Sequence, residues 1–496
     1  MGKQKGTLEQ SINGTIWLSA ASMIDYAINL MITAVLARLL TATDYGEVSA
    51  ITVLVGFADI FWQIGVSQAL IQKRDLQKKD IATGFYLNTA LCMLVFAALV
   101  FFADFWCSVF SINSAKMLRV YAMVYIFNGI MAIPTALLQR ELKFKITAAI
   151  GVLTHVIYGV AVVILAFCGF GPWALVIGML IRYGSKALMT IVSQRACYDF
   201  RLFNKQSMKE LLNFGGGFTI SKIFNYLANN GDYFVINKTL GKIQLGNYQK
   251  SYNLMMYPTN LIGSNLESIF FPVFSKEQSN KEKLGRAYIS ANVFIALLTV
   301  PISIVAYSIA EPLVIFFLSD KWVSIVPAFK IMIIGLYFRT AYKLGIALLK
   351  GQGKVYHNAV IQAVYALLVV VGAYLGHFKG LEGVALGVTI AFTTNYFMLL
   401  FANSYFIGFK LRVFARDMIV PVIYGGVVVC LLPIIQKLWA IPSSSFIKCV
   451  VCTLIVFPIY FGMVILTAKK LLSSETNTVV DKAFTTLGKK LLKKKK

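Results

Sequence analysis

The sequence predicts an all-α polytopic membrane protein of about 14 transmembrane helices, with two parallel six-helix lobes and two extra C-terminal helices. Of its 496 residues, 58% are hydrophobic and only 14% are charged, whereas an average soluble protein carries about 25% charged residues. The apolar residues form uncharged runs of about 18 residues or more, the length that spans a bilayer as a helix. Too few charges remain to cover soluble domains, so a soluble globular protein is excluded.

The apolar runs define the predicted spans in order, and clusters of charged residues separate most of them. We expect spans at 11–37, 47–71, 81–103, 118–138, 146–168, 172–193, 214–236, 247–272, 287–309, 324–349, 357–377, 382–406, 417–436 and 446–467.

The positive charges predict the orientation of these spans. Of the 47 Lys and Arg residues, 31 lie on one set of connections and 11 on the other, and cytoplasmic loops carry the excess. Both termini are therefore expected in the cytoplasm, with residues 1–10 as a polar lead and 468–496 as a basic amphipathic tail on the inner leaflet. Because this net charge of +26 serves membrane topology, we expect no nucleic acid partner.

Short motifs recur at nearly constant spacing and predict an internal duplication. They stand at equivalent helix boundaries: Leu40–Gly46 with Leu240–Gly246, Ala136–Gln139 with Ala347–Lys350, and Gly171–Gly178 with Gly380–Gly387. The repeating unit has six spans, an even number, so its two copies point the same way across the membrane, as in transporters built from parallel bundles.

This duplication predicts the domain organisation. We expect an N-lobe at 11–193, a cytoplasmic inter-lobe linker at 194–213, a C-lobe at 214–406 and helices 13 and 14 within 407–467. Two such lobes facing each other would enclose a cavity and give alternating access by rocking.

Nine ionisable residues of the predicted spans are singled out as embedded charges. Each costs about 2.5–3.5 kcal/mol at the bilayer centre on insertion scales, so such groups are candidates for function. Five are cations, namely Arg182, Lys186, Lys222, Arg339 and Lys343. The i, i+4 spacing of two pairs places like charges on one helix face, which suits an anionic substrate such as a phosphate. Alternatively, the lysines extend to the membrane edge and the arginines pair with acidic residues.

The acidic members of this set are Asp25, Asp59, Asp232 and Glu267. They are candidates for binding a coupling H⁺ or Na⁺, and equally for acting as counter-ions of the cations. His155 is expected to be a structural histidine bonded to a carbonyl rather than a proton relay. The seven cysteines lack ligand-like spacing, so no metal and no cofactor is expected. Gly215–Gly217 open span 214–236 and Asn229–Asp232 interrupt it, which suits a broken helix lining a cavity; equally, these are ordinary residues of a membrane helix.

Several stretches together resemble a known family. They are Gly14–Ile51, Ile71–Leu76, Ala136–Phe144, Gly169–Leu180 and Gly215–Ile236, and they include "LARLLTATDYG" and "GPWALVIG". In these stretches the chain is similar to the polysaccharide-unit flippases of the multidrug/oligosaccharidyl-lipid/polysaccharide exporter superfamily, near the colanic acid and teichuronic acid exporters.

The resemblance implies a flippase in a bacterial cytoplasmic membrane. Its expected substrate is an oligosaccharide linked to undecaprenyl diphosphate, held by cations in a cavity between two six-helix lobes, with polysaccharide polymerase and assembly proteins as candidate partners. The resemblance implies that cavity cations hold the diphosphate, but it matches none of the family's cations to a particular residue of this chain. A cation-coupled drug exporter of the same superfamily is the alternative, and should favour acidic and aromatic cavity groups. A membrane polymerase or acyltransferase is less favoured, because the outer loops are short and His155 has no evident catalytic partner.

Overall fold

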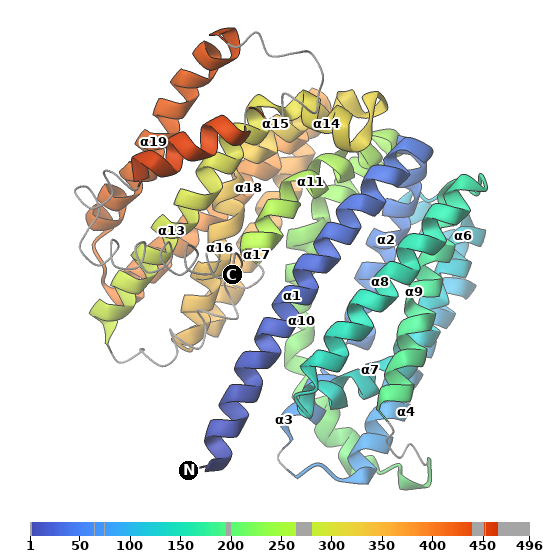
Figure 1. Ribbon diagram of the computed structural model, residues 1–496. Helices are drawn as coiled ribbons and strands as arrows, with labels where there is room; N and C mark the ends of the chain where they lie inside the picture. Colours follow the sequence, from blue (N-terminus) through green and yellow to red (C-terminus); the bar gives the residue numbers. More distant parts are fainter. Residues whose placement is uncertain are drawn as a thin grey trace, which may run out of the picture. The chain divides into compact units, whose positions relative to one another are not determined.

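The computed structural model describes residues 2–63, 65–73, 75–194, 200–263, 280–438, 451 and 453–464, and every element within these ranges is helical (Figure 1). Side chains are described in the same ranges except at 2–20, 72, 200, 213–222, 355 and 431–438. The contacts group the chain into two compact units, Met1–Gln249 and Lys250–Lys496. The boundary falls within one continuous helix, α11 (Gly241–Gly263).

The first unit contains α1 to α10 and the first turns of α11. These helices are α1 (Gly2–Leu39), α2 (Ala42–Trp62), α3 (Val66–Gln72), α4 (Lys78–Phe101), α5 (Ala103–Phe110), α6 (Ala115–Ala122), α7 (Val124–Arg140), α8 (Phe144–Phe167), α9 (Pro172–Ser193) and α10 (Lys205–Thr239), with a short 3₁₀ helix at Phe200–Leu202.

The second unit contains the remainder of α11 and the elements that follow it. They are α13 (Lys281–Ser308), α14 (Ala310–Leu318), a 3₁₀ helix (Asp320–Ile325), α15 (Val326–Ile334), α16 (Leu336–Gly351), α17 (Val355–Gly376), a 3₁₀ helix (His377–Lys379), α18 (Gly380–Ile407) and α19 (Leu411–Leu438). A short apolar helix at Thr453–Val464 is the last described element.

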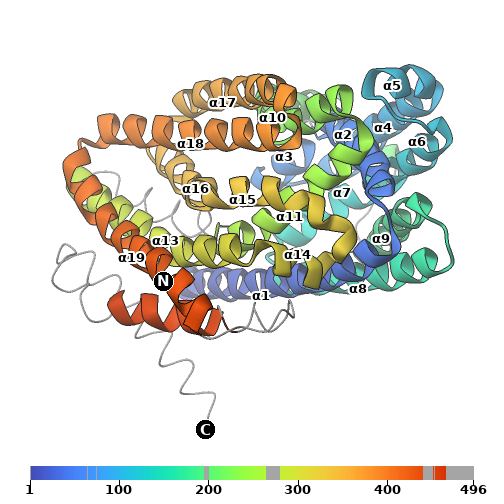
Figure 2. The ribbon, with the colours of Figure 1, turned by 90° about the horizontal axis from the view of Figure 1, so that it is seen from above.

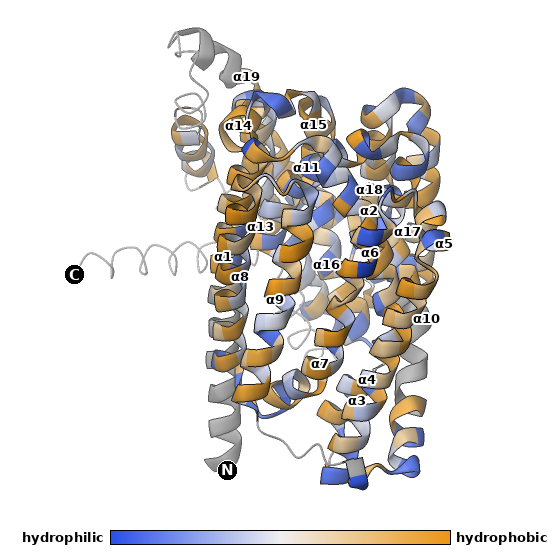
Figure 3. Ribbon diagram, turned by 90° about the vertical axis from the view of Figure 1, so that its right-hand side faces the viewer, coloured by the Kyte–Doolittle hydropathy of each residue, from blue (hydrophilic) through white to orange (hydrophobic). Residues whose placement is uncertain are grey.

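The predicted fold class is confirmed, since each predicted span overlaps helix within the described ranges. In those ranges nine helical stretches are long and apolar enough to cross a membrane, or ten if the bent pair Asp320–Ile334 and Leu336–Gly351 forms one span. One of the nine, Tyr356–Ile407, covers two predicted spans. The count of fourteen stays a prediction. Figure 3 shows that apolar residues predominate along the coloured part of α1 and along α8.

Local sequence signals explain where several helices begin. Thr41 accepts a hydrogen bond from the backbone N–H of Asp44, and the Asp44 carboxylate accepts one in return, which closes a capping box at the start of α2. Asn204 caps α10 by accepting from the N–H groups of Gln206 and Ser207. These side chains satisfy donors that the first helical turn leaves without partners.

Within the first unit, α1 packs on α8 and α8 packs on α9, and the three run side by side in Figure 1. A second group forms around α4, which packs on α7. Helix α10 contacts α2, α3 and α4, and Leu211 of α10 is buried in a cluster with Leu70 and Leu137. The predicted interruption of span 214–236 is wrong: α10 runs unbroken through Gly215–Gly217 and Asn229–Asp232, because neither motif contains a proline that would remove a backbone donor.

In the second unit, α17 and α18 lie side by side (Figure 2). Gly372 and Gly376 of α17 face Gly387 and Gly383 of α18, and a Cβ on any of the four would meet backbone atoms of the other helix closer than 3.0 Å. Two glycines spaced i, i+4 on each helix therefore let the backbones touch, as small residues do in membrane helix pairs.

Helix ends at repeat-related positions have the same backbone geometry. At the end of α7, Lys143 N–H donates to Leu138 O at 3.0 Å, and at the equivalent end of α16 Lys354 N–H donates to Leu349 O at 2.9 Å. Leu142 and Gly353, which precede these two lysines, both have positive φ, at 54° and 72°. Both helices thus end in the same hydrogen-bonded cap, which supports the predicted duplication.

The starts of α9 and α18 repeat each other in the same way. Gly171 and Gly380, the first residues of one motif pair, have φ of 53° and 69° with ψ of −131° and −154°. This region is accessible essentially to glycine alone.

Repeat-related glycines also face each other where α2 crosses the first turns of α11. A Cβ on Gly46 would meet the backbone carbonyl of Lys242, and a Cβ on Gly246 would meet that of Ala42, both closer than 3.0 Å. Gly46 and Gly246 hold the same place in the two copies of their motif, as do Ala42 and Lys242, so the contact is reciprocal. A self-complementary contact of this kind is what two copies of one repeat can make with each other, so it supports the predicted duplication.

Candidate functional site

A membrane-embedded polar pair joins α1 to α8 in the first unit. Asp25 Oδ1 lies 3.4 Å from His155 Nδ1, and their side chains are 30% and 7% exposed. Neither atom has a hydrogen-bond partner in the described part of the chain. The expectation that His155 bonds to a carbonyl is therefore not met; its ring nitrogen faces a carboxylate. The pair becomes an ion pair when the imidazole is protonated.

Two of the predicted substrate-binding cations belong to the same region. The Arg182 guanidinium of α9 lies 5.7 Å from the ring centre of Tyr158, and the Tyr158 ring contacts that of His155, with 6.0 Å between centres. Lys186 lies one turn further along α9, within electrostatic range of Arg182 and of Asp25. Three adjacent helices thus assemble a carboxylate, an imidazole and two cations, which we call the α1–α8–α9 cluster (Asp25, His155, Tyr158, Arg182 and Lys186).

The other acidic candidates of this unit lie elsewhere. Asp59 of α2 accepts a hydrogen bond from Trp62 Nε1 at 2.8 Å. Asp232 of α10 is buried, accepts from the Tyr248 hydroxyl at 2.6 Å and accepts from the N–H of Tyr233. The Asp232 contact connects α10 to α11, so this carboxylate has a structural partner whatever else it binds.

In the second unit, Arg339 of α16 is enclosed by tyrosines and is only 3% exposed. Its Nη1 donates to the Tyr365 hydroxyl at 3.0 Å and its Nη2 to the Tyr252 hydroxyl at 2.6 Å. The guanidinium also lies 5.2 Å from the ring centre of Tyr342 and 5.8 Å from that of Tyr252. Hydrogen bonds and cation–π contacts together hold this cation in place.

For the last three candidates, Lys343, Lys222 and Glu267, the structure describes few contacts or none. Lys343 lies one turn beyond Arg339, where its Cδ and Nζ would be 3.3 Å from a Cβ added to Gly263 of α11. Lys222 is on α10, but its side chain lies outside the described residues, as does Glu267 altogether. The structure therefore brings Arg182 and Lys186 together with Asp25, and it places Arg339 in a separate tyrosine setting.

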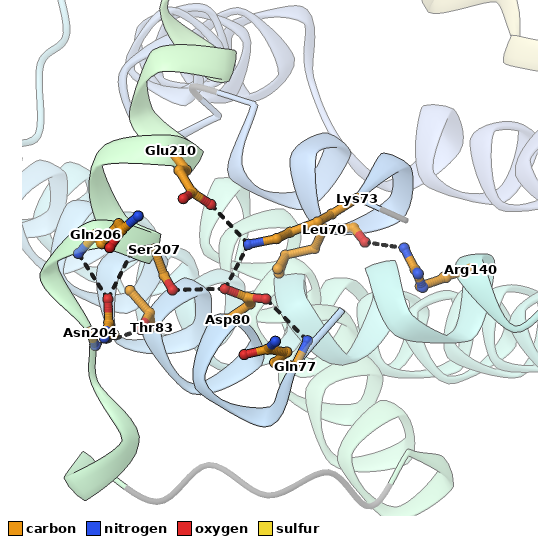
Figure 4. Close-up of polar contacts among 10 residues, drawn as sticks. All are labelled: Leu70, Lys73, Gln77, Asp80, Thr83, Arg140, Asn204, Gln206, Ser207 and Glu210. Carbon is orange, nitrogen blue, oxygen red and sulfur yellow. Dashed lines mark hydrogen bonds and ion pairs between the residues drawn. The ribbon is translucent and has the colours of Figure 1, made fainter. Parts of the chain in front are cut away.

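A polar cluster that the sequence did not reveal joins the start of α10 to α4 (Figure 4). Asp80 is fully buried and accepts hydrogen bonds from Lys73 Nζ at 2.9 Å and from the Ser207 hydroxyl at 2.7 Å. Lys73 Nζ also lies 2.9 Å from Glu210, and the Asn204 N–H donates to the Thr83 hydroxyl at 2.9 Å. These contacts fasten residues 204–210, within the predicted inter-lobe linker, to α4 and to Lys73 just before it.

The electrostatics of this cluster favour the charged form of its lysine. The hydrogen bond to Asp80 is the main cause that raises the pKa of Lys73 above its ordinary value, and the Glu210 carboxylate adds to it against the opposing effect of burial. Nearby, Arg140 donates to the carbonyls of Leu70 and Ile71 at 2.7 and 2.9 Å. The end of α7 is thereby tied to α3.

Apolar helices of membrane-spanning length with ionisable side chains held among them define a multi-pass membrane protein of the transporter type. Residues 35–327, more than half of the chain, match the family described as "Polysaccharide biosynthesis protein". The chain belongs to this family, as the resemblance in its sequence predicted.

Individual relatives are similar over most of the chain. The lipopolysaccharide biosynthesis protein WzxC of Escherichia coli K12 is 24% identical over 411 residues, which is 81% of each chain. The teichuronic acid biosynthesis protein TuaB of Bacillus subtilis is 23% identical and covers 66% of this chain and 68% of its own length. The succinoglycan biosynthesis transport protein ExoT of Rhizobium meliloti is 22% identical, with 68% of each chain covered.

Solved structures share the fold. The lipid II flippase MurJ, in an inward closed conformation, superposes with a TM-score of 0.71 over 91% of this chain and 98% of its own, at 16% identity. An inward-facing multidrug resistance transporter of the MATE family, from the MOP superfamily, gives a TM-score of 0.65 over 80% of this chain and 98% of its own, also at 16% identity.

Proposed function

We propose that this protein moves an oligosaccharide linked to undecaprenyl diphosphate from the cytoplasmic to the outer leaflet of a bacterial cytoplasmic membrane, for surface polysaccharide synthesis. Membership of the polysaccharide biosynthesis family supports the pathway. The observation that carries the transport role is the α1–α8–α9 cluster, in which Arg182 lies against Tyr158 and Lys186 lies within electrostatic range of the Asp25 carboxylate.

The physical reason is the charge of the cargo. A diphosphate with attached sugars cannot cross about 30 Å of hydrocarbon unaided, whereas cations in a wet cavity would hold it while the polyprenyl chain stays in lipid. Arg182 can donate two parallel hydrogen bonds to a phosphate, and Lys186 adds a point charge. Arg339 and Lys343 are the candidate contacts in the second lobe, and Lys222 remains a candidate from its sequence position.

Transport by this route needs no covalent chemistry, only a change in the side to which the cavity opens. In the proposed cycle the two predicted lobes rock against each other, with both termini in the cytoplasm. The contact of Gly46 with Gly246, where α2 crosses α11, would close the outer side. Asp25 with His155 is the candidate site for a coupling H⁺, with Na⁺ as the other candidate ion. Polymerase and assembly proteins are the expected partners.

A cation-coupled drug exporter is the second candidate, favoured by the fold of the MATE transporter and by the aromatic enclosure of Arg339. It differs in its cargo, because an exporter of organic cations has no use for paired Arg and Lys groups in its cavity. Asp25 would then be the main contact for the substrate.

Reconstitution of the purified full chain in proteoliposomes tests the proposal. Fluorescent lipid-linked oligosaccharide is placed in both leaflets and a membrane-impermeant quencher is added outside; the expected result is complete quenching with the protein and about half without it. Arg182→Gln should slow transfer, and Lys379→Gln, which removes a cation outside the cluster, should not. Equal transfer with and without the protein, or transport of an organic cation instead, would overturn the proposal.

A further inference from the structure

A pocket of about 430 Å³ lies in the second unit where α13 begins and α18 passes into α19. Its size falls within the range of small-molecule sites, roughly 300–1,000 Å³. The lining includes the cations Lys281, Arg286 and Lys410 and the acidic residue Glu282. The pocket belongs to the second unit, whereas the α1–α8–α9 cluster belongs to the first.

Local backbone geometry builds the pocket. Gly408, with φ of 80°, ends α18 in the left-handed conformation that glycine adopts without strain. The turn directs Phe409 against α13, where its ring centre lies 5.6 Å from that of Tyr288 and where the missing side chain of Gly285 leaves room for it. Lys410 then stands directly before α19.

The electrostatics of the pocket favour an anion. Lys281 is the first residue of α13 and Lys410 precedes the first residue of α19, so two helix N-termini, each with a partial positive charge, start at its lining. Arg286 is half exposed and pairs with Glu282, the only acidic residue among the described residues of the lining. The remaining two lysines leave the lining with a positive charge.

The rest of the lining is apolar. Ile289 and Ile407 are buried, and Val413 of α19 is 42% exposed. A cationic rim over an apolar wall matches a ligand that is itself amphipathic, with a phosphate at one end and hydrocarbon at the other. Basic pockets between membrane helices on the cytoplasmic side bind anionic lipid head groups for this reason, and the positive-inside pattern of the chain predicts that α13 begins on that side.

We infer that this pocket binds the phosphate of an anionic phospholipid from the leaflet that it faces, with Lys281, Lys410 and Arg286 as its ligands. The bound lipid would join the start of α13 to the turn between α18 and α19. The inference does not depend on what the protein transports, because a lipid can occupy this site without being carried across the membrane.

The test is binding of fluorescently labelled phosphatidylglycerol to the purified full chain in a neutral detergent, followed by anisotropy. Lys281→Gln and Lys410→Gln should each weaken binding about fivefold, and the double variant about thirtyfold, at the energy that one basic residue near an anionic surface contributes. Glu282→Gln should strengthen binding, because it removes the one acidic group of the described lining, a carboxylate that pairs with Arg286.

Lys379→Gln is the matched control, since it removes an exposed lysine outside the pocket and should leave binding unchanged. The opposite signs expected for Lys281→Gln and Glu282→Gln separate a binding effect from damage to the fold, which would weaken binding in both. Unchanged binding in the double variant would overturn the inference.

Competition identifies the source of the phosphate. Unlabelled phosphatidylglycerol should displace the probe, whereas glycerol 3-phosphate and phosphatidylcholine should not. Displacement by glycerol 3-phosphate at equal concentration would show a site for free phosphate. Tighter displacement by a polyprenyl diphosphate would assign the pocket to the transported substrate, and either result would refute a phospholipid site.

Discussion

Replacing Gly46 by alanine should force α2 and α11 apart. The new Cβ would meet the backbone carbonyl of Lys242 at less than 3.0 Å, whereas ordinary contact begins near 3.4 Å, so the two backbones must separate by at least a few tenths of an ångström. The opposing atom belongs to the backbone of a helix and cannot rotate away as a side chain would. Overpacking of this kind typically costs about 1–3 kcal/mol. Gly246→Ala should cost a similar amount, because it meets Ala42 in the reciprocal way.

The effect of Gly46→Ala on conformation depends on which states of the transport cycle contain the contact between α2 and α11. If it closes the outer side in one state and opens in the other, the cost falls on the closed state alone. A cost of about 2 kcal/mol then shifts the ratio of closed to open molecules about thirtyfold toward the open state. The double variant should shift it less than the sum of the two, because both substitutions act on the same contact.

Spin labels at the exposed, repeat-related positions Thr43 and Ile243 of a cysteine-free chain report this shift as a longer distance between α2 and α11. Gly151→Ala is the matched control, since a Cβ at Gly151 in α8 meets nothing within 4 Å. A lower melting temperature with an unchanged distance distribution would mean that the crossing persists in every state. Unchanged stability and distance together would refute the backbone contact itself.

Three further outcomes are expected. Asp25→Asn should reduce the dependence of transport on the H⁺ or Na⁺ gradient, and unchanged ion dependence in flux assays would assign Asp25 a structural role. Arg182→Ala and Arg339→Ala should each abolish polysaccharide export in cells while surface expression persists; normal export in both would remove the assignment of these cations to the substrate site. Asp80→Asn should destabilise the protein by about 1–3 kcal/mol, because it weakens the bonds to a buried acceptor, whereas Glu210→Gln, at a half-exposed position, should cost less than about 1 kcal/mol. The pKa of Lys73 is raised in the folded protein. The stability that the Lys73–Asp80 ion pair contributes is therefore complete below the pKa of Lys73 in the unfolded chain, about 10.4, and is lost only as pH rises through its pKa in the folded protein. The difference in melting temperature between the wild type and Asp80→Asn should thus be constant between about pH 6 and pH 9.

The sequence predicted features that depend on local patterns. Apolar runs located the helices, because a bilayer requires each spanning segment to satisfy its own backbone groups. The three motif pairs predicted a duplication, and Gly171 and Gly380 show why short motifs can carry such a signal. A glycine-only conformation is required at both positions, so the residue is retained although the surrounding side chains differ.

Contacts between distant residues were not predictable in the same way. The approach of His155 to Asp25 joins two helices that are far apart in the sequence, and no local pattern specifies which side chain of α8 faces α1. The tyrosines around Arg339 come from α11, α16 and α17 and look like ordinary apolar-helix residues in the sequence. Asp80 was recognisable only as an acidic residue in a first helical turn, and its role depends on Ser207, which lies 127 residues away.

The boundary between the predicted repeats and the boundary between the two compact units fall at different residues, and this difference affects how the protein would move. In the predicted duplication the second copy begins with span 214–236, which lies in α10, so the predicted linker 194–213 would be the hinge. Yet α10 is fastened to α4 through Ser207 at its start and to α5 at its end, where Lys238 Nζ donates to the carbonyl of Ser108 at 3.0 Å, and the contacts divide the chain at Gln249 and Lys250 instead. A rigid-body motion between the two compact units would therefore bend α11, which also contains Pro258 and so lacks one helical hydrogen bond, and it would leave α10 in place.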